Sequence, residues 1–192
     1  MKIYKSDIFT ISNTLSFLRL LLVIPVWISL DNYHEGIYRI LTFSLCIFAG
    51  VTDYLDGYLA RNRNEVTEVG KIIDPLADKI LVAALTIKLF LLGELSTYFL
   101  LLIIIRDIII FIGGLIISIK IRQVLPSNLL GKITVTITGF VFLLVIAGIN
   151  KNHIIFTTVY FASIFLLYAS LTAYLIRAME FLKKNRQYEH IN

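Results

Sequence analysis

Four aspartates occur at spacings that could hold divalent cations. Asp53 and Asp56 are three residues apart, and Asp74 and Asp78 are four apart. Either spacing puts both side chains on one face of a helix. Carboxylate ligands without His or Cys suit Mg²⁺, Mn²⁺ or Ca²⁺, and four negative charges would balance two such ions, a pair that commonly clamps phosphate oxygens during displacement. We therefore expect a metal site for phosphate chemistry, formed by Asp53, Asp56, Asp74 and Asp78.

Small residues accompany these aspartates. Gly57 follows Asp56, Ala60 lies about one turn further on, and Gly70 lies one turn before Asp74. They leave room for a flat, bulky group, and Arg61 supplies a guanidinium suited to a phosphate. Taken singly, the small residues also fit close helix packing. Together with the aspartates they indicate a nucleotide-diphosphate pocket.

The elements that carry these residues are predicted to cross a membrane. The 192 residues are 58% hydrophobic and 16% charged, whereas soluble domains carry about 25% charged residues. A spanning helix needs about 20 apolar residues, and six stretches approach that length: 14–30, 37–60, 72–92, 96–119, 131–149 and 154–176. Membrane strands would need only about 10 residues with alternating polarity. We predict an all-α polytopic membrane protein with six transmembrane helices in one domain, residues 1–192.

Charge asymmetry predicts the orientation. Twelve of the 18 lysines and arginines fall in segments on one side, and only Arg39 and Lys151 fall in the opposite loops. Positive charge is enriched in cytoplasmic loops, so both termini should be cytoplasmic. This bias also accounts for the net charge of +5, and no nucleic-acid partner is expected. Residues 1–12 fit either a short interfacial amphipathic helix or a frayed polar lead.

Aspartates inside membrane spans could also have a structural or a transport role. In the structural role they would serve as helix caps and ion pairs, with Asp74 capping a helix that begins at Pro75. In the transport role they would form the coupling site of an ion-driven transporter. Transporters tend to have inverted repeats and charges near the midplane, whereas here the carboxylates cluster at one end of two consecutive spans and no repeat is visible.

The string Asp53-x2-Asp56-Gly57-x2-Ala60-Arg61-x8-Gly70-x3-Asp74-x3-Asp78 resembles the signature of the CDP-alcohol phosphatidyltransferase family. That resemblance, over residues 53–78 of a single membrane domain, implies attack of an acceptor hydroxyl on the β-phosphate of a CDP-linked donor, with release of CMP. It implies that Asp78 is the general base and that the CDP donor is held by Asp53, Gly57, Ala60, Arg61, Gly70 and Asp74. The cofactor is expected to be Mg²⁺ or Mn²⁺, two ions per site, bound by the four aspartates.

The acceptor substrate is indicated by residues outside this signature. The opening stretch 11–20, with Pro25 beyond it, and the Leu130-Gly131-Lys132 stretch resemble phosphatidylglycerophosphate synthases. The resemblance implies transfer of a phosphatidyl group from CDP-diacylglycerol to glycerol 3-phosphate, giving phosphatidylglycerophosphate. An anionic acceptor needs fixed cations, for which Arg106, Arg122 and Lys132 are candidates. Arg106 could instead pair with an aspartate, and the other two could be ordinary cytoplasmic charges.

Two departures keep other acceptors open. Arg106 is followed by Asp107 where these synthases usually have Glu, and Thr134 stands where a second lysine is expected. The first departure resembles CMP-forming cardiolipin synthases, which use phosphatidylglycerol, and another CDP-alcohol phosphotransferase activity also stays open. The resemblance further implies a homodimer. No organelle-targeting presequence is visible, so we expect the cytoplasmic membrane, and the charge asymmetry puts the active site at its cytoplasmic side. Gly113-Gly114 fits either a helix contact between subunits or packing within one.

Overall fold

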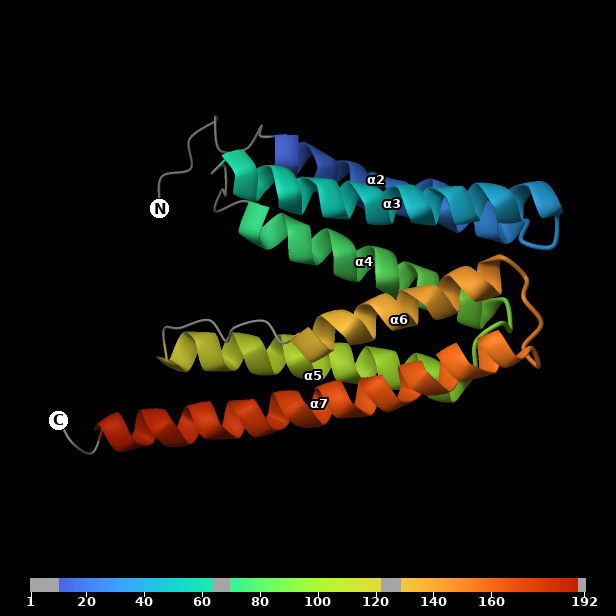
Figure 1. Ribbon diagram of the computed structural model, residues 1–192. Coiled ribbons are helices and arrows are strands. Elements are labelled where there is room, and N and C mark those ends of the chain that lie inside the picture. Colours follow the sequence, from blue (N-terminus) through green and yellow to red (C-terminus); the bar gives the residue numbers. More distant parts are fainter. Residues whose placement is uncertain (1–10, 64–69, 122–128, 190–192) are drawn as a thin grey trace. The chain divides into compact units, whose positions relative to one another are not determined.

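The computed structural model describes residues 11–63, 70–121 and 129–189. All the regular structure in these residues is helical, as predicted (Figure 1). The helices are α2 (Ile11–Asp31), α3 (Gly36–Arg63), α4 (Gly70–Leu91), α5 (Thr97–Ile121), α6 (Leu129–Ile146) and α7 (Ile154–Glu189). The stretch that fits an interfacial helix or a frayed lead falls almost wholly on residues 1–10, outside the described residues, and residues 11 and 12 belong to α2.

Each of the six predicted stretches corresponds to one helix, and most ends agree within a few residues. The largest difference is at α7, which continues to Glu189, whereas the predicted span stopped at residue 176. The prediction followed hydropathy, which falls where Arg177 and the later charges begin. Ala, Met, Glu, Leu and Lys in this stretch are good helix formers, so the helix continues beyond its apolar part.

Five of the helices in the described part of the chain are long and apolar enough to cross a membrane. Their apolar windows are Thr14–Asp31, Gly36–Leu55, Thr97–Gly114, Leu129–Ile146 and Ile154–Phe181. The helix α4 is not among these five, so the sixth crossing stays a prediction, as does the cytoplasmic placement of the termini.

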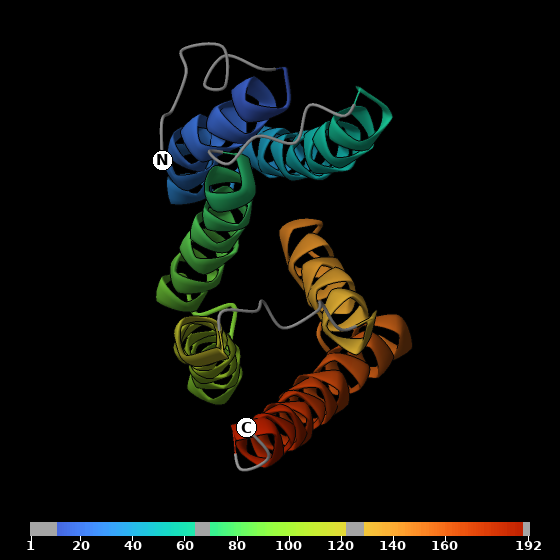
Figure 2. The ribbon, with the colours of Figure 1, turned by 90° about the vertical axis from the view of Figure 1, so that its left-hand side faces the viewer.

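The chain divides into two compact units. The first takes the chain up to Glu94 together with Phe142–Ile149, and the second takes Leu95–Val141 and the chain from Asn150 onward. In the first unit α2 packs along both α3 and α4, as Figure 2 shows from a direction closer to the helix axes. Its core follows every fourth residue of α2 and of α4, which is one side of an α-helix: Leu22, Val26 and Leu30 on α2, and Ala77, Leu81, Leu85 and Leu89 on α4.

Polar contacts also join elements of the first unit. The hydroxyls of Ser29 on α2 and Thr42 on α3 lie 2.8 Å apart, and both are buried. The hydroxyl of Tyr33 donates to the carbonyl of Val145 at 2.6 Å, which links the turn after α2 to the end of α6. Hydrogen bonds between helices stabilise packing where apolar faces meet lipid instead of water.

Two glycines end helices in this unit. After α4, Gly93 N–H bonds to the Phe90 carbonyl and Glu94 N–H to the Leu89 carbonyl. Gly148 and the residue after it donate the equivalent pair of hydrogen bonds after α6, and both glycines have a φ of 73°. This is the Schellman arrangement, which satisfies the last helical carbonyls and favours glycine in the left-handed region.

In the second unit α5 packs against α7, and a line of buried hydroxyls joins α6 to α7. Thr138 and Ser163 share a hydrogen bond of 3.0 Å, and Thr134 reaches the carbonyl of Leu166 at 3.2 Å. Thr134, Thr138 and Ser163 are all buried. These three side chains form what we call the hydroxyl seam.

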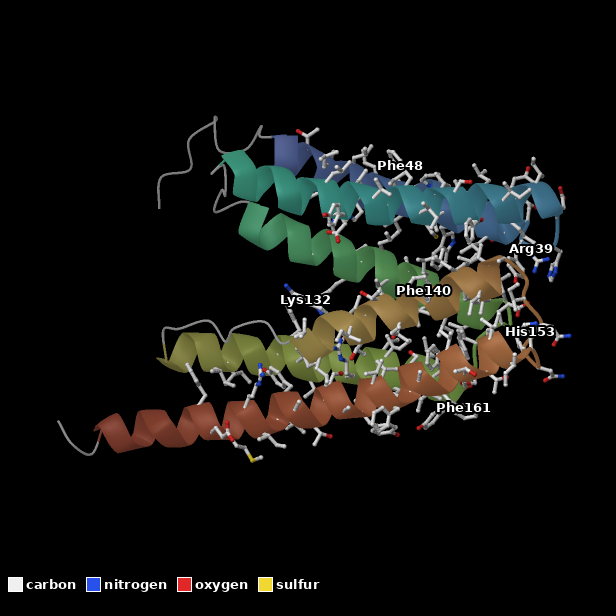
Figure 3. All side chains as sticks on the ribbon, viewed as in Figure 1. Arg39, Phe48, Lys132, Phe140, His153 and Phe161 are labelled. Atoms are coloured by element: carbon white, nitrogen blue, oxygen red, sulfur yellow. The ribbon has the colours of Figure 1, made fainter. Side chains whose placement is uncertain are left out.

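Large apolar side chains cover the outsides of the helices in both units. Phe48 on α3 and Phe161 on α7 project outward (Figure 3) and are 47% and 63% exposed. Exposed apolar surface on this scale is costly in water but matches the hydrocarbon of a bilayer.

Candidate active site

The eight signature positions lie on two antiparallel helices of the first unit. Asp53, Asp56, Gly57, Ala60 and Arg61 belong to the last part of α3, and Gly70, Asp74 and Asp78 to the first part of α4. The end of α3 and the start of α4 lie at the same end of the unit (Figure 1). Both aspartate pairs are therefore helical, so the expectation that each pair shares a helix is confirmed.

Convergence of the four carboxylates stays a prediction. Except for Asp53, the side chains of the signature residues lie outside the described residues. The proposal that Asp74 caps its helix is wrong, because α4 begins at Gly70, four residues earlier.

Asp53 is paired with a buried arginine from α2. Arg19 Nη1 lies 3.0 Å from Asp53 Oδ1, and the two side chains are 1% and 52% exposed. The guanidinium is thus enclosed, while about half of the aspartate side-chain surface stays exposed. Asp53 can therefore accept from Arg19 and still offer carboxylate surface to a ligand.

Arg19 lies within the first predicted span, and the sequence alone assigned it no role. A charged side chain inside a membrane helix almost always faces a partner, and this signal could have pointed to an aspartate of the signature. The sequence could not have identified Asp53 as the partner, because the partner depends on which faces of α2 and α3 meet.

The donor set fits a hard divalent cation by its chemistry. Four carboxylates supply oxygen ligands of the kind that Mg²⁺ and Mn²⁺ bind, and Asp53 has open surface. Among the side chains that the structure describes, no group of three or more His, Cys, Asp or Glu residues could hold a metal. Asp53 is the one member of the predicted set in that part of the chain, so the metal site stays a prediction.

In the second unit Arg106 on α5 is buried, at 6% exposure. Its Nη1 lies 2.5 Å from Asp107 Oδ1, and its Nε donates to Ser170 Oγ on α7 at 3.3 Å. Pairing of Arg106 with an aspartate, one of the two alternatives, is therefore what the structure shows. Its Nη2 lies beside Gly131, 3.5 Å from where a Cβ would stand, so the guanidinium reaches the start of α6.

The other two acceptor candidates are Lys132 and Arg122. Lys132 is exposed and extends from the first turn of α6 (Figure 3), and Arg122 lies outside the described residues. Thr134, which stands where a second lysine was expected, is fully buried in the hydroxyl seam. Its hydroxyl donates to the Leu130 carbonyl at 2.7 Å, so this position packs helices and cannot place an exposed cation.

The Gly113-Gly114 pair packs against α7 within the second unit. A Cβ added to Gly113 would lie 2.8 Å from the hydroxyl oxygen of Tyr174 on α7, and one added to Gly114 would lie 3.6 Å from it. Of the two alternatives for this pair, the structure shows packing within one chain. The homodimer stays a prediction.

Known proteins resemble this chain over most of its length. The family model of CDP-alcohol phosphatidyltransferase matches residues 9–176. A CDP-diacylglycerol–glycerol-3-phosphate 3-phosphatidyltransferase of Rickettsia typhi is 34% identical over 71% of this chain and 76% of its own length. A probable phosphatidylglycerophosphate synthase of Mycobacterium tuberculosis is 30% identical over 91% and 84%, and a CDP-diacylglycerol–glycerol-3-phosphate 3-phosphatidyltransferase of Aquifex aeolicus is 29% identical over 91% and 98%.

The apolar helices and the signature that they carry are those of a multi-pass membrane transferase. The chain belongs to the CDP-alcohol phosphatidyltransferase family and is an enzyme of phospholipid biosynthesis. The resemblance read from residues 53–78 is thereby confirmed.

Proposed function

We propose that this enzyme transfers the phosphatidyl group of CDP-diacylglycerol to glycerol 3-phosphate. The observation that carries the proposal is the placement of the complete signature on α3 and α4, in a chain that resembles transferases named for these two substrates over up to 91% of its length. CMP-forming cardiolipin synthesis remains the second candidate, because Asp107 follows Arg106 where phosphatidylglycerophosphate synthases usually have Glu, and because Thr134 adds no cation.

In the proposed reaction, the acceptor's hydroxyl oxygen forms a bond to the β-phosphorus of the donor. The bond from that phosphorus to the bridging oxygen breaks, CMP leaves, and the hydroxyl proton passes to Asp78. A base is needed because an alcohol is a poor nucleophile at neutral pH. Arg61, with Gly57, Ala60 and Gly70 around it, would hold the diphosphate.

Asp53, Asp56, Asp74 and Asp78 would hold two Mg²⁺ or Mn²⁺ ions. Bound there, these ions would neutralise charge on the diphosphate and on the CMP leaving group. Asp53 would contribute the carboxylate surface that Arg19 leaves open.

Arg106, Arg122 and Lys132 would bind the acceptor's phosphate. Ser170 and Asp107 hold the guanidinium of Arg106 on two sides, and a fixed guanidinium suits a phosphate group. The positive-inside bias of the sequence supports an active site at the cytoplasmic face of the cytoplasmic membrane. There lipid tails stay in the bilayer while glycerol 3-phosphate enters from water. The proposal includes a homodimer, which the mass of the purified protein would test.

The test is CMP release from CDP-diacylglycerol by the purified chain with Mg²⁺ or Mn²⁺. Glycerol 3-phosphate, phosphatidylglycerol, inositol phosphate and serine are offered in turn. Asp78→Asn should lower turnover by about 10²- to 10⁴-fold, the usual worth of a general base. Glu35→Gln, an exposed carboxylate just before the opposite end of α3, is the control and should keep full activity.

The outcomes of this test separate the proposed activity from the alternative ones. Activity with glycerol 3-phosphate alone supports the proposal, and activity with phosphatidylglycerol alone moves the chain to the cardiolipin synthases. Activity that survives complete chelation of divalent cations overturns the metal site. If no acceptor releases CMP and Asp78→Asn has no effect, the catalytic role of the aspartates is wrong and the transporter hypothesis reopens.

A further inference from the structure

The ion pair between Arg19 and Asp53 is unequal. The arginine side chain is 1% exposed and the aspartate 52%. Water cannot solvate the enclosed guanidinium, so the arginine depends on protein partners, whereas the half-open carboxylate can be solvated without it. A simple structural tie would not require a member of the catalytic signature as its anion, so the identity of Asp53 points to a further role.

We propose that Arg19 is a positioning residue for Asp53 and the fixed counter-charge of the four-aspartate cluster. It holds Oδ1 of Asp53 at 3.0 Å, so the carboxylate keeps one orientation and turns its remaining surface to the site. It also adds one positive charge beside four negative ones, which moderates the attraction of the site for cations before the anionic donor arrives. This inference rests on the proposed function, because it assumes that the four aspartates bind divalent cations.

The same unit contains a matched pair that has no link to the signature. Lys88 at the end of α4 pairs with Asp31 at the end of α2, and their side chains are 10% and 56% exposed. The ammonium of Lys88 also lies 4.8 Å from the ring centroid of Trp27. Both pairs thus tie α2 to a neighbouring helix through an enclosed cation and a half-open carboxylate. Lys88→Met is therefore the control for the purely structural effect of losing such a cation.

Removing the charge of Arg19 should strengthen Mn²⁺ binding and slow turnover. Arg19→Met should lower the dissociation constant for Mn²⁺ of the donor-free protein by at least about fivefold, because a nearby positive charge no longer repels the ion. Turnover should fall by about ten- to a hundredfold, because the carboxylate loses its fixed orientation and small misplacements are costly. General damage to the fold would weaken metal binding, so tighter binding together with slower turnover is diagnostic.

The experiment measures Mn²⁺ binding by electron paramagnetic resonance on purified full-length protein in nanodiscs, without donor. CMP release is then measured on the same samples. Arg19→Lys keeps the charge but makes a less directional contact, so its Mn²⁺ affinity should match the wild type and its turnover should be partly restored. Lys88→Met should lower the thermal midpoint about as much as Arg19→Met but leave both Mn²⁺ affinity and turnover within about twofold of the wild type.

Arg19→Met leaves a half-exposed carboxylate and no buried charge from this pair, so we expect it to fold. If it does not, Arg19→Gln, which keeps a hydrogen-bond donor and loses the charge, should show the same tightening. The inference is overturned if the Arg19 variant that folds, Arg19→Met or Arg19→Gln, binds Mn²⁺ no more tightly than Lys88→Met does. It is also overturned if both of these Arg19 variants fail to fold while Lys88→Met folds. Failure of the wild type itself to bind Mn²⁺ or release CMP would instead count against the proposed function.

Discussion

The Nε of Arg106 donates a hydrogen bond to the Oγ of Ser170 across 3.3 Å, which joins the middle of α5 to α7. Both side chains are buried. Arg106 therefore has a defined orientation, with its Nη2 beside Gly131 at the start of α6.

If this guanidinium binds the acceptor, its loss should change the Michaelis constant for glycerol 3-phosphate. Arg106→Met should raise that constant about tenfold or more, because a charge-assisted contact to phosphate is lost, and should leave the constant for CDP-diacylglycerol unchanged. Ser170→Ala should raise it about threefold, since the guanidinium is then held on one side only. Steady-state CMP release with each substrate varied in turn measures both constants.

Ser163→Ala is the matched control for Ser170→Ala. Ser163 is also buried on α7, but it bonds to Thr138 and not to Arg106. It should reduce stability by about 1 kcal/mol without changing either Michaelis constant. Equal effects of the two serine variants on the acceptor constant would contradict the positioning of Arg106 by Ser170.

Gly113 accommodates Tyr174, whose buried hydroxyl has no hydrogen-bond partner within the described part of the chain. Gly113→Ala should destabilise the protein by about 1–3 kcal/mol, because its methyl group would lie too close to that oxygen. Gly114→Ala, whose methyl would meet the same oxygen at 3.6 Å, should cost less. Thermal unfolding in one detergent ranks the variants.

Tyr174→Phe tests the same contact from the opposite helix. Removing a buried hydroxyl that makes no hydrogen bond to the described residues should be neutral or stabilising, and it should also make room for the methyl of Gly113→Ala. The double variant should therefore be more stable than Gly113→Ala alone. Strict additivity of the two changes would show that the hydroxyl is not what limits residue size at position 113.

Gly148 and Gly93 share a φ of 73° but differ in their surroundings. No described atom lies within 4 Å of a Cβ at Gly93, whereas the guanidinium of Arg39 occupies that space at Gly148. Gly93→Ala should cost about 1–2 kcal/mol for the left-handed backbone. Gly148→Ala should cost more, because Arg39 must also leave its place over the ring of Tyr33, 4.8 Å from the centroid.

An Arg39→Ala background separates the two costs at Gly148. There Gly148→Ala should destabilise the protein about as much as Gly93→Ala does, because only the backbone cost remains. A difference that persists in this background would mean that something besides Arg39 limits position 148. Thermal midpoints of the single and double variants measure it.

Thr134 is a packing position, so introducing the lysine that was expected there should not improve acceptor binding. Thr134→Lys would place an ammonium in the hydroxyl seam, where the native side chain is fully buried, and should destabilise the protein strongly. Thr134→Val, which loses only the contacts to Leu130 and Leu166, should cost about 1 kcal/mol. A well-folded Thr134→Lys with a lower Michaelis constant for glycerol 3-phosphate would show that this residue can reach the acceptor.

Much of this protein is determined by local sequence. The helices follow from continuous apolar runs, and the placement of Asp53 with Asp56 and of Asp74 with Asp78 follows from helical periodicity. The family follows from the fixed spacing between residues 53 and 78. Each of these features depends on residues within a few turns of one another, so a single sequence contains the information.

The tertiary structure decided which partners the buried polar groups have. The sequence alone left the role of Arg19 undefined, left Arg106 between two roles and left Gly113-Gly114 between two kinds of contact. The structure pairs Arg19 with Asp53, places Ser170 and Asp107 on Arg106, and sets Tyr174 against Gly113. Nearly all these partners lie far away in the sequence. They meet only because particular faces of two helices pack, and in spans that are apolar on nearly every side hydrophobic periodicity does not reveal which faces those are.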